Sequence, residues 1–286
     1  MKKSLLLVAS VFLLACQQQS DSDFKTLYSL PKKLKEVSGI TYFPDSKLIY
    51  TLEDSGNKNA IYAINQEGKL AKTITVSNAK NIDWEDITKD KNGNIYIGDF
   101  GNNDNTRKDL CIYKVAKNEL NKDQASAEYK ISFSYPEQTE FPPKKKELFY
   151  DVEGFFEYQN YFYLFTKNRS KGFDGTAFIY KIANKPGTQK AIKIGEFKTC
   201  NNYNHCVLTS ATISPDGKKV VLLSHDKIVL FKGFKGDLFH KGTQTEIKLN
   251  HFSQKEAIVF KDNNTLLIAD EKTNKVGGNV YEFKLK

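Results

Sequence analysis

The chain has 286 residues, of which 40% are hydrophobic and 27% charged, so it is long enough to bury a sizeable core. Its formal net charge is +9, yet nearly all of the positive charge is lysine, and arginine occurs only at Arg107 and Arg169. Lysine dispersed along strand surfaces is typical of a solvated face, so we expect no nucleic-acid partner.

The N-terminus has the pattern of an export signal. Lys2 and Lys3 precede an apolar stretch that ends at Ala15, and this stretch is too short for a spanning helix, which needs roughly 20 apolar residues. Residues 1–15 are therefore interpreted as a signal peptide. Such a signal is either a lipoprotein signal, in which the following Cys16 is modified, or an ordinary secretory signal that a cysteine follows by chance.

The segment Leu13-Leu14-Ala15-Cys16 resembles a bacterial lipoprotein signal, in which cleavage leaves Cys16 as the lipidated first residue. Residues 16–23 are polar, as expected of a tether. The resemblance implies a chain anchored to a membrane of the bacterial cell envelope, and Gln17 after the cysteine suggests the outer membrane. Which leaflet it faces is left open.

A repeated pattern dominates the rest of the chain. Five times an acidic or hydroxyl residue opens a short strand, and a second strand follows about ten residues later and ends in a polar cluster. The openings are Ser38-Gly39-Ile40, Glu85-Asp86-Ile87, Glu153-Gly154-Phe155, Ser210-Ala211-Thr212 and Glu256-Ala257-Ile258. Strands that repeat at this period predict a ring of blades.

Each repeat accommodates four strands and shows no long helical period, which indicates an all-β fold. In the first repeat we predict strands at 39–43, 48–53, 59–64 and 70–76. Fourth strands of later repeats are predicted at 128–135, 191–197 and 246–250.

The last repeat stops after its third strand, and the segment 24–30 is a strand without a repeat of its own. We expect this segment to supply the missing outer strand of the last blade, which would pair the exposed edge. Residues 24–286 are thus predicted to form one five-bladed β-propeller of four-stranded antiparallel blades, as a monomer. The alternative is a sixth blade in 136–150, but this segment contains Pro142-Pro143 and lacks alternation, so we predict a long loop.

Three cysteines follow besides Cys16. Cys200 and Cys206 enclose a polar loop and are expected to form a disulfide in an oxidising compartment, with free thiols as the alternative. One cysteine pair and one histidine supply too few ligands for a usual zinc site. Cys111 lies in an apolar strand and is expected to be a buried small hydrophobe.

The first strand of each propeller blade lines the central channel, so the five opening residues are expected to form one ring: Ser38, Glu85, Glu153, Ser210 and Glu256. Carboxylates that are close together raise one another's pKa unless a cation compensates them. Calcium fits this set because it accepts carboxylates, hydroxyls and water in flexible geometry. The alternative is that these are the residue types that fit near a crowded axis, with water in the channel.

The order Ser, Glu, Glu, Ser, Glu, one per blade, resembles the central calcium site of the calcium-activated nucleotidases (apyrases), which are five-bladed propellers. The segment from Trp84-Glu85 to Gly101 is similar to a family segment in which a Glu and a Trp precede a strand and a Gly-rich loop. Here the Trp precedes the Glu, and Asn102-Asn103-Asp104 replaces the family's basic and aromatic residues. The resemblance implies a central calcium and a nucleotide-like substrate.

Both arginines follow the second strand of a blade and are expected near the channel mouth, where their planar guanidinium groups would suit an anionic, phosphate-containing ligand. The alternative is that they pair with nearby acids such as Asp104 or Asp174. If the chain hydrolyses phosphate esters or anhydrides, we expect Asp99 to act as base and Arg107 and Arg169 to hold the developing charge. The second hypothesis is a non-catalytic binding module in which calcium only fastens the blades.

Overall fold

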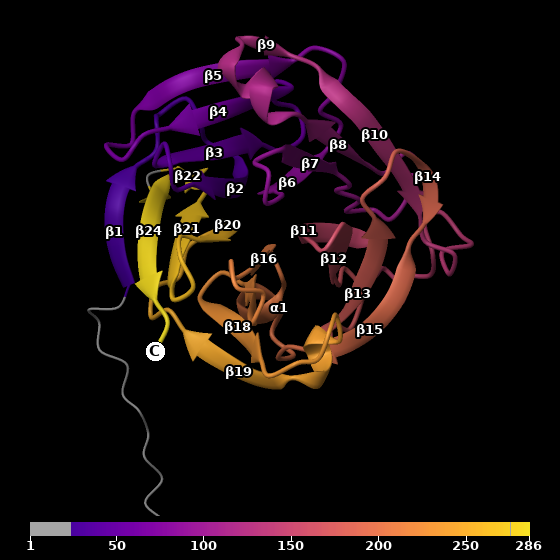
Figure 1. Ribbon diagram of the computed structural model, residues 1–286. Helices are drawn as coiled ribbons and strands as arrows, with labels where there is room; N and C mark the ends of the chain where they lie inside the picture. The colour runs from indigo at the N-terminus through magenta and orange to yellow at the C-terminus, as the bar shows by residue number, and fades with distance from the viewer. Residues whose placement is uncertain (1–23, 275) are drawn as a thin grey trace, which may run out of the picture.

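The computed structural model describes residues 24–274 and 276–286, and these form a five-bladed β-propeller (Figure 1). The predicted signal peptide, the tether and Cys16 lie outside the described residues. The helices that are described are short turns, and none has the length or apolar character needed to cross a bilayer.

The strands follow the repeat. Blade 1 contains β2 (Val37–Phe43), β3 (Leu48–Glu53), β4 (Ala60–Ile64) and β5 (Leu70–Val76), and blade 2 contains β6 (Trp84–Lys89), β7 (Ile95–Asp99), β8 (Cys111–Val115) and β10 (Ala127–Ser134). Blade 3 contains β11 (Asp151–Tyr158), β12 (Tyr161–Lys167), β13 (Thr176–Ala183) and β15 (Ile192–Lys198). Blade 4 contains β16 (Ser210–Ile213), β17 (Lys219–Leu223), β18 (Lys227–Lys232) and β19 (Thr243–Lys248).

Blade 5 closes the ring as predicted. It contains β20 (Lys255–Phe260), β21 (Thr265–Asp270) and β24 (Asn279–Lys284), and its outer strand is β1 (Phe24–Ser29), which pairs antiparallel with β24. In Figure 1 the indigo β1 lies beside the yellow β24, so the two ends of the described chain meet in one sheet.

Two blades carry a fifth strand that the prediction of four did not include. The strand β9 (Gln124–Ala125) pairs in parallel with β5 of the preceding blade, and β14 (Gly187–Lys190) pairs in parallel with β10 of the preceding blade. Both strands lie in the connection between the third and fourth strands of their own blade, and such short segments lack an alternation that a sequence pattern can detect. The segment 136–150 is a loop, as predicted.

The remaining elements of the described residues are small: a hairpin of β22 (Lys272–Thr273) and β23 (Val276–Gly277), the helical turn α1 (Tyr203–Cys206) and 3₁₀ turns at Lys117–Asn121 and Phe239–Lys241. The apolar core consists of five clusters, each of which lies between two neighbouring blades. The cluster between blades 5 and 1, for example, packs Val37 and Ile49 against Leu267 and Val280. Burial between blades therefore holds the ring together.

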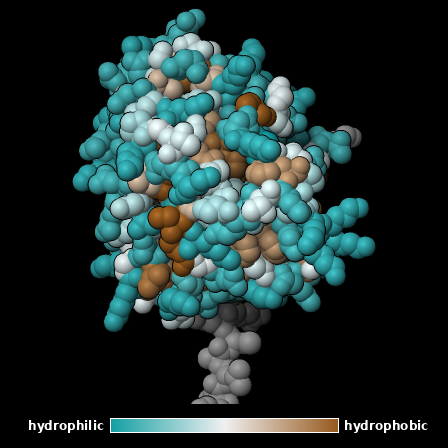
Figure 2. Space-filling view, turned by 90° about the vertical axis from the view of Figure 1, so that its right-hand side faces the viewer, coloured by the Kyte–Doolittle hydropathy of each residue, from teal (hydrophilic) through white to brown (hydrophobic). Residues whose placement is uncertain are grey.

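One face of the outer surface can be followed in Figure 2. The face in Figure 2 is mostly hydrophilic, with apolar residues in small separate patches. The lysine-rich composition thus has its counterpart in solvated side chains on the outer strands, as in the ion pair between Lys193 and Glu196 of β15.

Candidate functional site

The innermost strands of the five blades are β2, β6, β11, β16 and β20, and each contacts the next around the channel. In four of them the pairing register skips one residue, and the skipped residues are Ser38, Glu85, Glu153 and Glu256. A β-bulge of this kind leaves one residue unpaired and re-aims its side chain. In the fifth blade Ser210 opens β16 and pairs with Leu223.

The two serines make contacts between blades. The hydroxyl of Ser38 donates to the carbonyl oxygen of Trp84 at 2.8 Å, and the hydroxyl of Ser210 donates to Oδ2 of Asp86 at 3.3 Å. Each serine therefore fastens its blade to a residue of blade 2. Their oxygens still carry lone pairs, but both protons are already used.

The innermost strands begin at one end of the channel, which we call the channel mouth. Three acids lie close together there: Glu85, Glu153 and Asp151. One carboxylate oxygen from each residue lies within 4.8 Å of the others, and we refer to these three residues as the acid cluster. Two of them come from the predicted ring. Asp151 was not predicted, although it stands two positions before Glu153 on the same strand, so the alternation of β11 contained a signal for it.

Two cations of blade 3 neutralise part of the acid cluster. Lys167 is buried and its Nζ lies 3.0 Å from Oε1 of Glu153. Arg169 places Nη2 2.8 Å from the same oxygen and Nε 2.6 Å from Oδ2 of Asp151. The other oxygen of Asp151 accepts a hydrogen bond from the backbone N–H of Asn102 at 2.7 Å. Lys167 was not predicted, because only the two arginines stand out among the many lysines of the sequence.

Arg107 is held by other acids. Its Nη2 lies 2.9 Å from Oδ1 of Asp99, its Nε lies 3.0 Å from Asp109, and its Nη1 donates to the carbonyl oxygen of Gly101 at 2.8 Å. Both arginines are thus paired with carboxylates, as the second interpretation of them expected, but the partners are not the acids named there. Asp99 is completely buried, and its Oδ1 also accepts the backbone N–H of Asp83.

The channel mouth has more carboxylates than these cations can neutralise. Burial and then the charges of Glu36 and Asp83 raise the pKa of Asp54 to about 7. Burial and the nearby Glu256 raise the pKa of Glu271 to about 8, and burial raises the pKa of Glu153 to about 8 against the opposing effect of Lys167. Burial and the charge of Glu153 raise the pKa of Glu85 well above its usual value. Burial and the mutual repulsion of these acids therefore favour their protonated forms.

One acid lies on the channel axis itself. Asp86 is 1% exposed, and its carboxylate accepts hydrogen bonds from the backbone N–H of Phe155 at 3.1 Å, from that of Ile87 at 2.8 Å and from the hydroxyl of Ser210. The equivalent residues of the other four blades are all small: Gly39, Gly154, Ala211 and Ala257. A Cβ on Gly39 would lie 2.6 Å from Oδ1 of Asp86. The small residues leave room for this one side chain to fill the axis.

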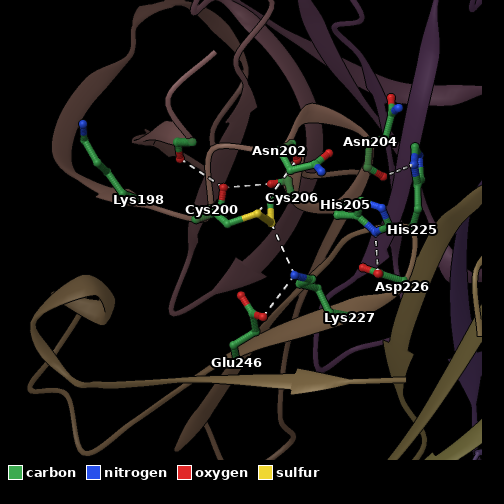
Figure 3. Close-up of a disulfide and its surroundings, with 12 residues drawn as sticks. Lys198, Cys200, Asn202, Asn204, His205, Cys206, His225, Asp226, Lys227 and Glu246 are labelled. Atoms are coloured by element: carbon green, nitrogen blue, oxygen red, sulfur yellow. Dashed lines mark hydrogen bonds and ion pairs between the residues drawn. A yellow bond between two sulfur atoms is a disulfide. The ribbon is translucent and has the colours of Figure 1, made fainter. Parts of the chain in front are cut away.

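The disulfide loop lies beside the mouth. Cys200 and Cys206 are bonded, and the loop between them contains α1 (Figure 3). Its carbonyl oxygen at Asn204 accepts from His225 Nδ1 at 3.0 Å, while the other ring nitrogen of His225 lies 3.5 Å from Glu256. The hydroxyl of Tyr203 accepts a hydrogen bond from Arg169 at 3.0 Å. The cross-linked loop therefore reaches two residues of the mouth.

Comparison with known proteins gives the fold alone. No family model matches the chain, and no curated protein matches it. Among solved structures, the PQQ-bound aldose sugar dehydrogenase from Streptomyces coelicolor is similar, with a TM-score of 0.55 at 10% identity over 91% of this chain and 97% of that one. Catalytically inactive virginiamycin B lyase from Staphylococcus aureus aligns with a TM-score of 0.43 at 15% identity, over 87% of this chain. This chain spans 66% of the lyase structure, slightly less than two thirds.

The likeness to the sugar dehydrogenase supports a propeller, a fold that hosts enzymes and binding proteins alike. The resemblance to the calcium-activated nucleotidases, the calcium ion and the roles of individual residues stay predictions.

Proposed function

We propose that the channel mouth binds a calcium ion through the acid cluster of Glu85, Asp151 and Glu153. The observation that carries this proposal is the excess of carboxylates over cations at one end of the channel, where several acids have a raised pKa. A divalent cation would remove the cost of ionising these groups together. We propose Ser38, Ser210 and Glu256 of the predicted ring as further ligands.

The donor atoms fit calcium better than other metals. The cluster offers carboxylate oxygens only, and hard oxygen donors in an irregular arrangement suit calcium, whereas zinc prefers nitrogen or sulfur. Glu85 has no hydrogen-bond partner among the described residues, so it is available as a ligand. Lys167 and Arg169 would remain beside the ion and limit the total charge of the site.

The function that we propose is calcium-dependent hydrolysis of a phosphate ester or anhydride of nucleotide-like chemistry. Calcium would supply Lewis-acid stabilisation of negative charge on a phosphoryl oxygen. Arg169 adjoins the acid cluster and would orient an anionic substrate there. Arg107, held by Asp99, would keep the Gly101 loop in place.

Asp54 replaces Asp99 as the base in this proposal. A general base has to reach a water molecule, and Asp99 is completely buried and bound to Arg107. Asp54 is only partly buried, and its pKa of about 7 suits proton transfer near neutral pH.

A non-catalytic binding module is the second candidate, and one observation favours it. Each arginine is already paired with two acids, which is the arrangement expected if these residues hold loops rather than substrate. In that case calcium would fasten the blades, and the loops would engage an envelope or extracellular ligand.

Metal analysis separates calcium binding from catalysis. We expect chelator-treated protein to take up about one calcium ion per chain, and Glu153→Gln to weaken binding by about tenfold or more, since one of few charged ligands is lost. The matched control is Glu196→Gln on the outer strand β15, which removes an exposed carboxylate and should change nothing. Absence of calcium uptake by the wild-type protein would contradict the proposal.

Phosphate release tests the reaction. Calcium-loaded wild-type protein is expected to release phosphate from nucleoside di- or triphosphates or from p-nitrophenyl phosphate, and Arg107→Lys with Arg169→Lys should lower the rate while calcium uptake persists. Calcium uptake without phosphate release would reject the hydrolase and leave the binding module.

We further propose that Cys16 carries a lipid that anchors the propeller at the outer membrane. A disulfide between Cys200 and Cys206 supports an oxidising compartment outside the cytoplasm. Metabolic labelling with an alkyne analogue of palmitate should mark the full chain, and Cys16→Ser should abolish the label. The control Cys111→Ser removes the buried free thiol and should keep it.

A further inference from the structure

The end of the channel opposite the acid cluster contains a pocket of about 450 Å³. It lies where the innermost strands run toward their hairpin turns, and the side chains of Thr41, Thr88, Phe156, Ile213 and Val259 line it, one from each blade. We refer to it as the lower pocket. Its volume falls in the range of small-molecule sites, which is about 300 to 1,000 Å³.

The lower pocket is separate from the calcium site. Asp86 and the four small residues at its level fill the channel between the two, because a Cβ on Gly39 would already meet Asp86 and a Cβ on Gly154 would lie 2.4 Å from the backbone nitrogen of Ala211. A ligand in the lower pocket would therefore enter from the turn side and would not reach the acid cluster.

The walls of the lower pocket have two kinds of surface. Phe156, Ile213 and Val259 form an apolar wall on three consecutive blades, which Thr212 and Ser214 interrupt in blade 4. On the other two blades, Thr41 and Thr88 supply hydroxyls. Neither of these hydroxyls has a hydrogen-bond partner among the described residues. Unpaired hydroxyls on one side and apolar groups on the other match a ligand that has a hydrogen-bonding edge and an apolar face.

The rim of the pocket adds further hydrogen-bonding and apolar groups, and its charged residues balance. Tyr158, Asn160 and Gln159 contribute an aromatic ring and two amides at the turn of blade 3. Lys89 and Lys91 are balanced in number by Asp90 and Glu157. The carboxylate of Asp90 is already occupied by the backbone N–H groups of Asn92 and Asn94 and by the hydroxyl of Tyr96. This neutral rim contrasts with the acidic mouth.

We infer that the lower pocket binds a neutral pyranose ring, as a free sugar or as a unit of a glycan. One face of a pyranose consists of C–H groups that pack on aromatic and aliphatic side chains, and its edge carries hydroxyls that pair with threonine and amide groups. Such a site would make the propeller a sugar-binding protein, whatever the acid cluster does.

Saturation-transfer NMR tests the inference on the full propeller. The probes are the methyl pyranosides of glucose, galactose, mannose and N-acetylglucosamine. At least one is expected to receive saturation, most strongly on the C–H protons of its apolar face, and to shift the methyl resonances of Ile213 and Val259 in the protein. No transfer to any of the four probes would overturn the inference.

Substitutions place the binding in the pocket. Thr41→Val with Thr88→Val keeps the shape but removes the hydroxyls of these two blades, and should weaken binding by about tenfold or more. The matched control is Thr243→Val with Thr245→Val, the same change on the exposed outer strand β19. Glu153→Gln at the mouth should leave sugar binding unchanged. Binding that survives the pocket variant, or that is lost in the Glu153 variant alone, would refute the assignment.

Discussion

A single buried carboxylate, that of Asp86, connects several blades at the axis. It comes from blade 2, accepts the backbone N–H of Phe155 in blade 3 and the hydroxyl of Ser210 in blade 4, and packs against Gly39 of blade 1. Burial alone raises the pKa of Asp86 well above its usual value, while these donors act in the opposite direction. These hydrogen-bond donors therefore offset the free-energy cost of burying the carboxylate of Asp86.

Removing this carboxylate should destabilise the propeller. Asp86→Ala leaves buried backbone donors without acceptors and creates a void, which we expect to lower the free energy of unfolding by about 3 kcal/mol or more. Urea denaturation followed by fluorescence measures the loss. The control Asp45→Ala removes an exposed acid and should change stability by about 0.5 kcal/mol or less. A loss of the same small size in Asp86→Ala would refute this role.

At the residue scale, the sequence predicted which residues lie at the channel better than it predicted their ion-pair partners. The repeat placed Glu85 and Glu153 at equivalent sites, and the structure brings them together. It did not predict Asp151 or Lys167, because these lie outside the repeated tripeptide and their proximity depends on how β11 pairs with β12. The ion pairs of Arg107 and Arg169 were also open, since several acids stand near each arginine in the chain.

At the scale of single elements, β1 completes the last blade. It pairs with β24 along its length, and Phe24 stacks on Tyr281 with ring centroids 4.7 Å apart. The sequence predicted this closure because the last repeat lacks a fourth strand. It could not predict β9 and β14, which extend neighbouring blades through a few backbone hydrogen bonds each.

Deletion of β1 is expected to open the ring. A chain that starts after Ser29 leaves the edge of β24 unpaired, so it should lose cooperative unfolding and associate through that edge. Size-exclusion chromatography and thermal unfolding measure both effects. Adding a synthetic peptide of residues 24–29 should partly restore the monomer, whereas a scrambled peptide should not. A truncated chain that stays monomeric and unfolds like the full propeller would contradict this expectation.

The disulfide should make only a modest contribution to the free energy of unfolding, because it closes a short loop. Closing a loop as short as that between Cys200 and Cys206 is worth about 2 kcal/mol by the entropy of the unfolded chain. Cys200→Ser with Cys206→Ser should reduce stability by about that amount. Reductant should destabilise the wild type to the same level and leave the double variant unchanged. Equal stability of wild type and variant under oxidising conditions would show that the loop is held by other contacts.

At the scale of the whole molecule, the excess of acids at the mouth predicts a pH dependence. Asp54 and Glu271 have pKa values of about 7 and about 8 in the folded state, above those of the unfolded chain. Between pH 5 and 8 the folded state therefore binds more protons than the unfolded state, and stability falls as pH rises. Calcium-free protein should thus show a thermal midpoint that decreases from pH 5 to pH 8.

A double variant checks the origin of this slope. Asp54→Asn with Glu271→Gln removes both titrations and should make the decrease smaller, while Glu153, whose pKa is also about 8, keeps part of it. Added calcium should reduce the decrease in the wild type. Burial lowers the pKa of Lys255 to about 8, so this lysine adds an opposite slope only above that pH. An unchanged slope in the double variant would show that other groups control it.

The fold as a whole was predictable because its information is repeated. Five copies of one strand pattern predict the number of blades, and the apolar alternation predicts the clusters between them. The features that occur once were not predicted. These are the single Asp86 among four small residues, and the lower pocket, in which only two blades place a threonine at the position of Thr41 and Thr88. These differences between the blades cannot be predicted from a pattern that all five blades share.

The pairing of β1 with β24 also imposes an order on biosynthesis. A chain that emerges from its N-terminus produces β1 first, but the partner of β1 begins only at Asn279. The first strand must therefore stay unpaired until almost the whole propeller has been made, and β9 and β14 similarly complete each blade only after part of the next one exists. Folding should therefore end with the capture of the strand that is synthesised first.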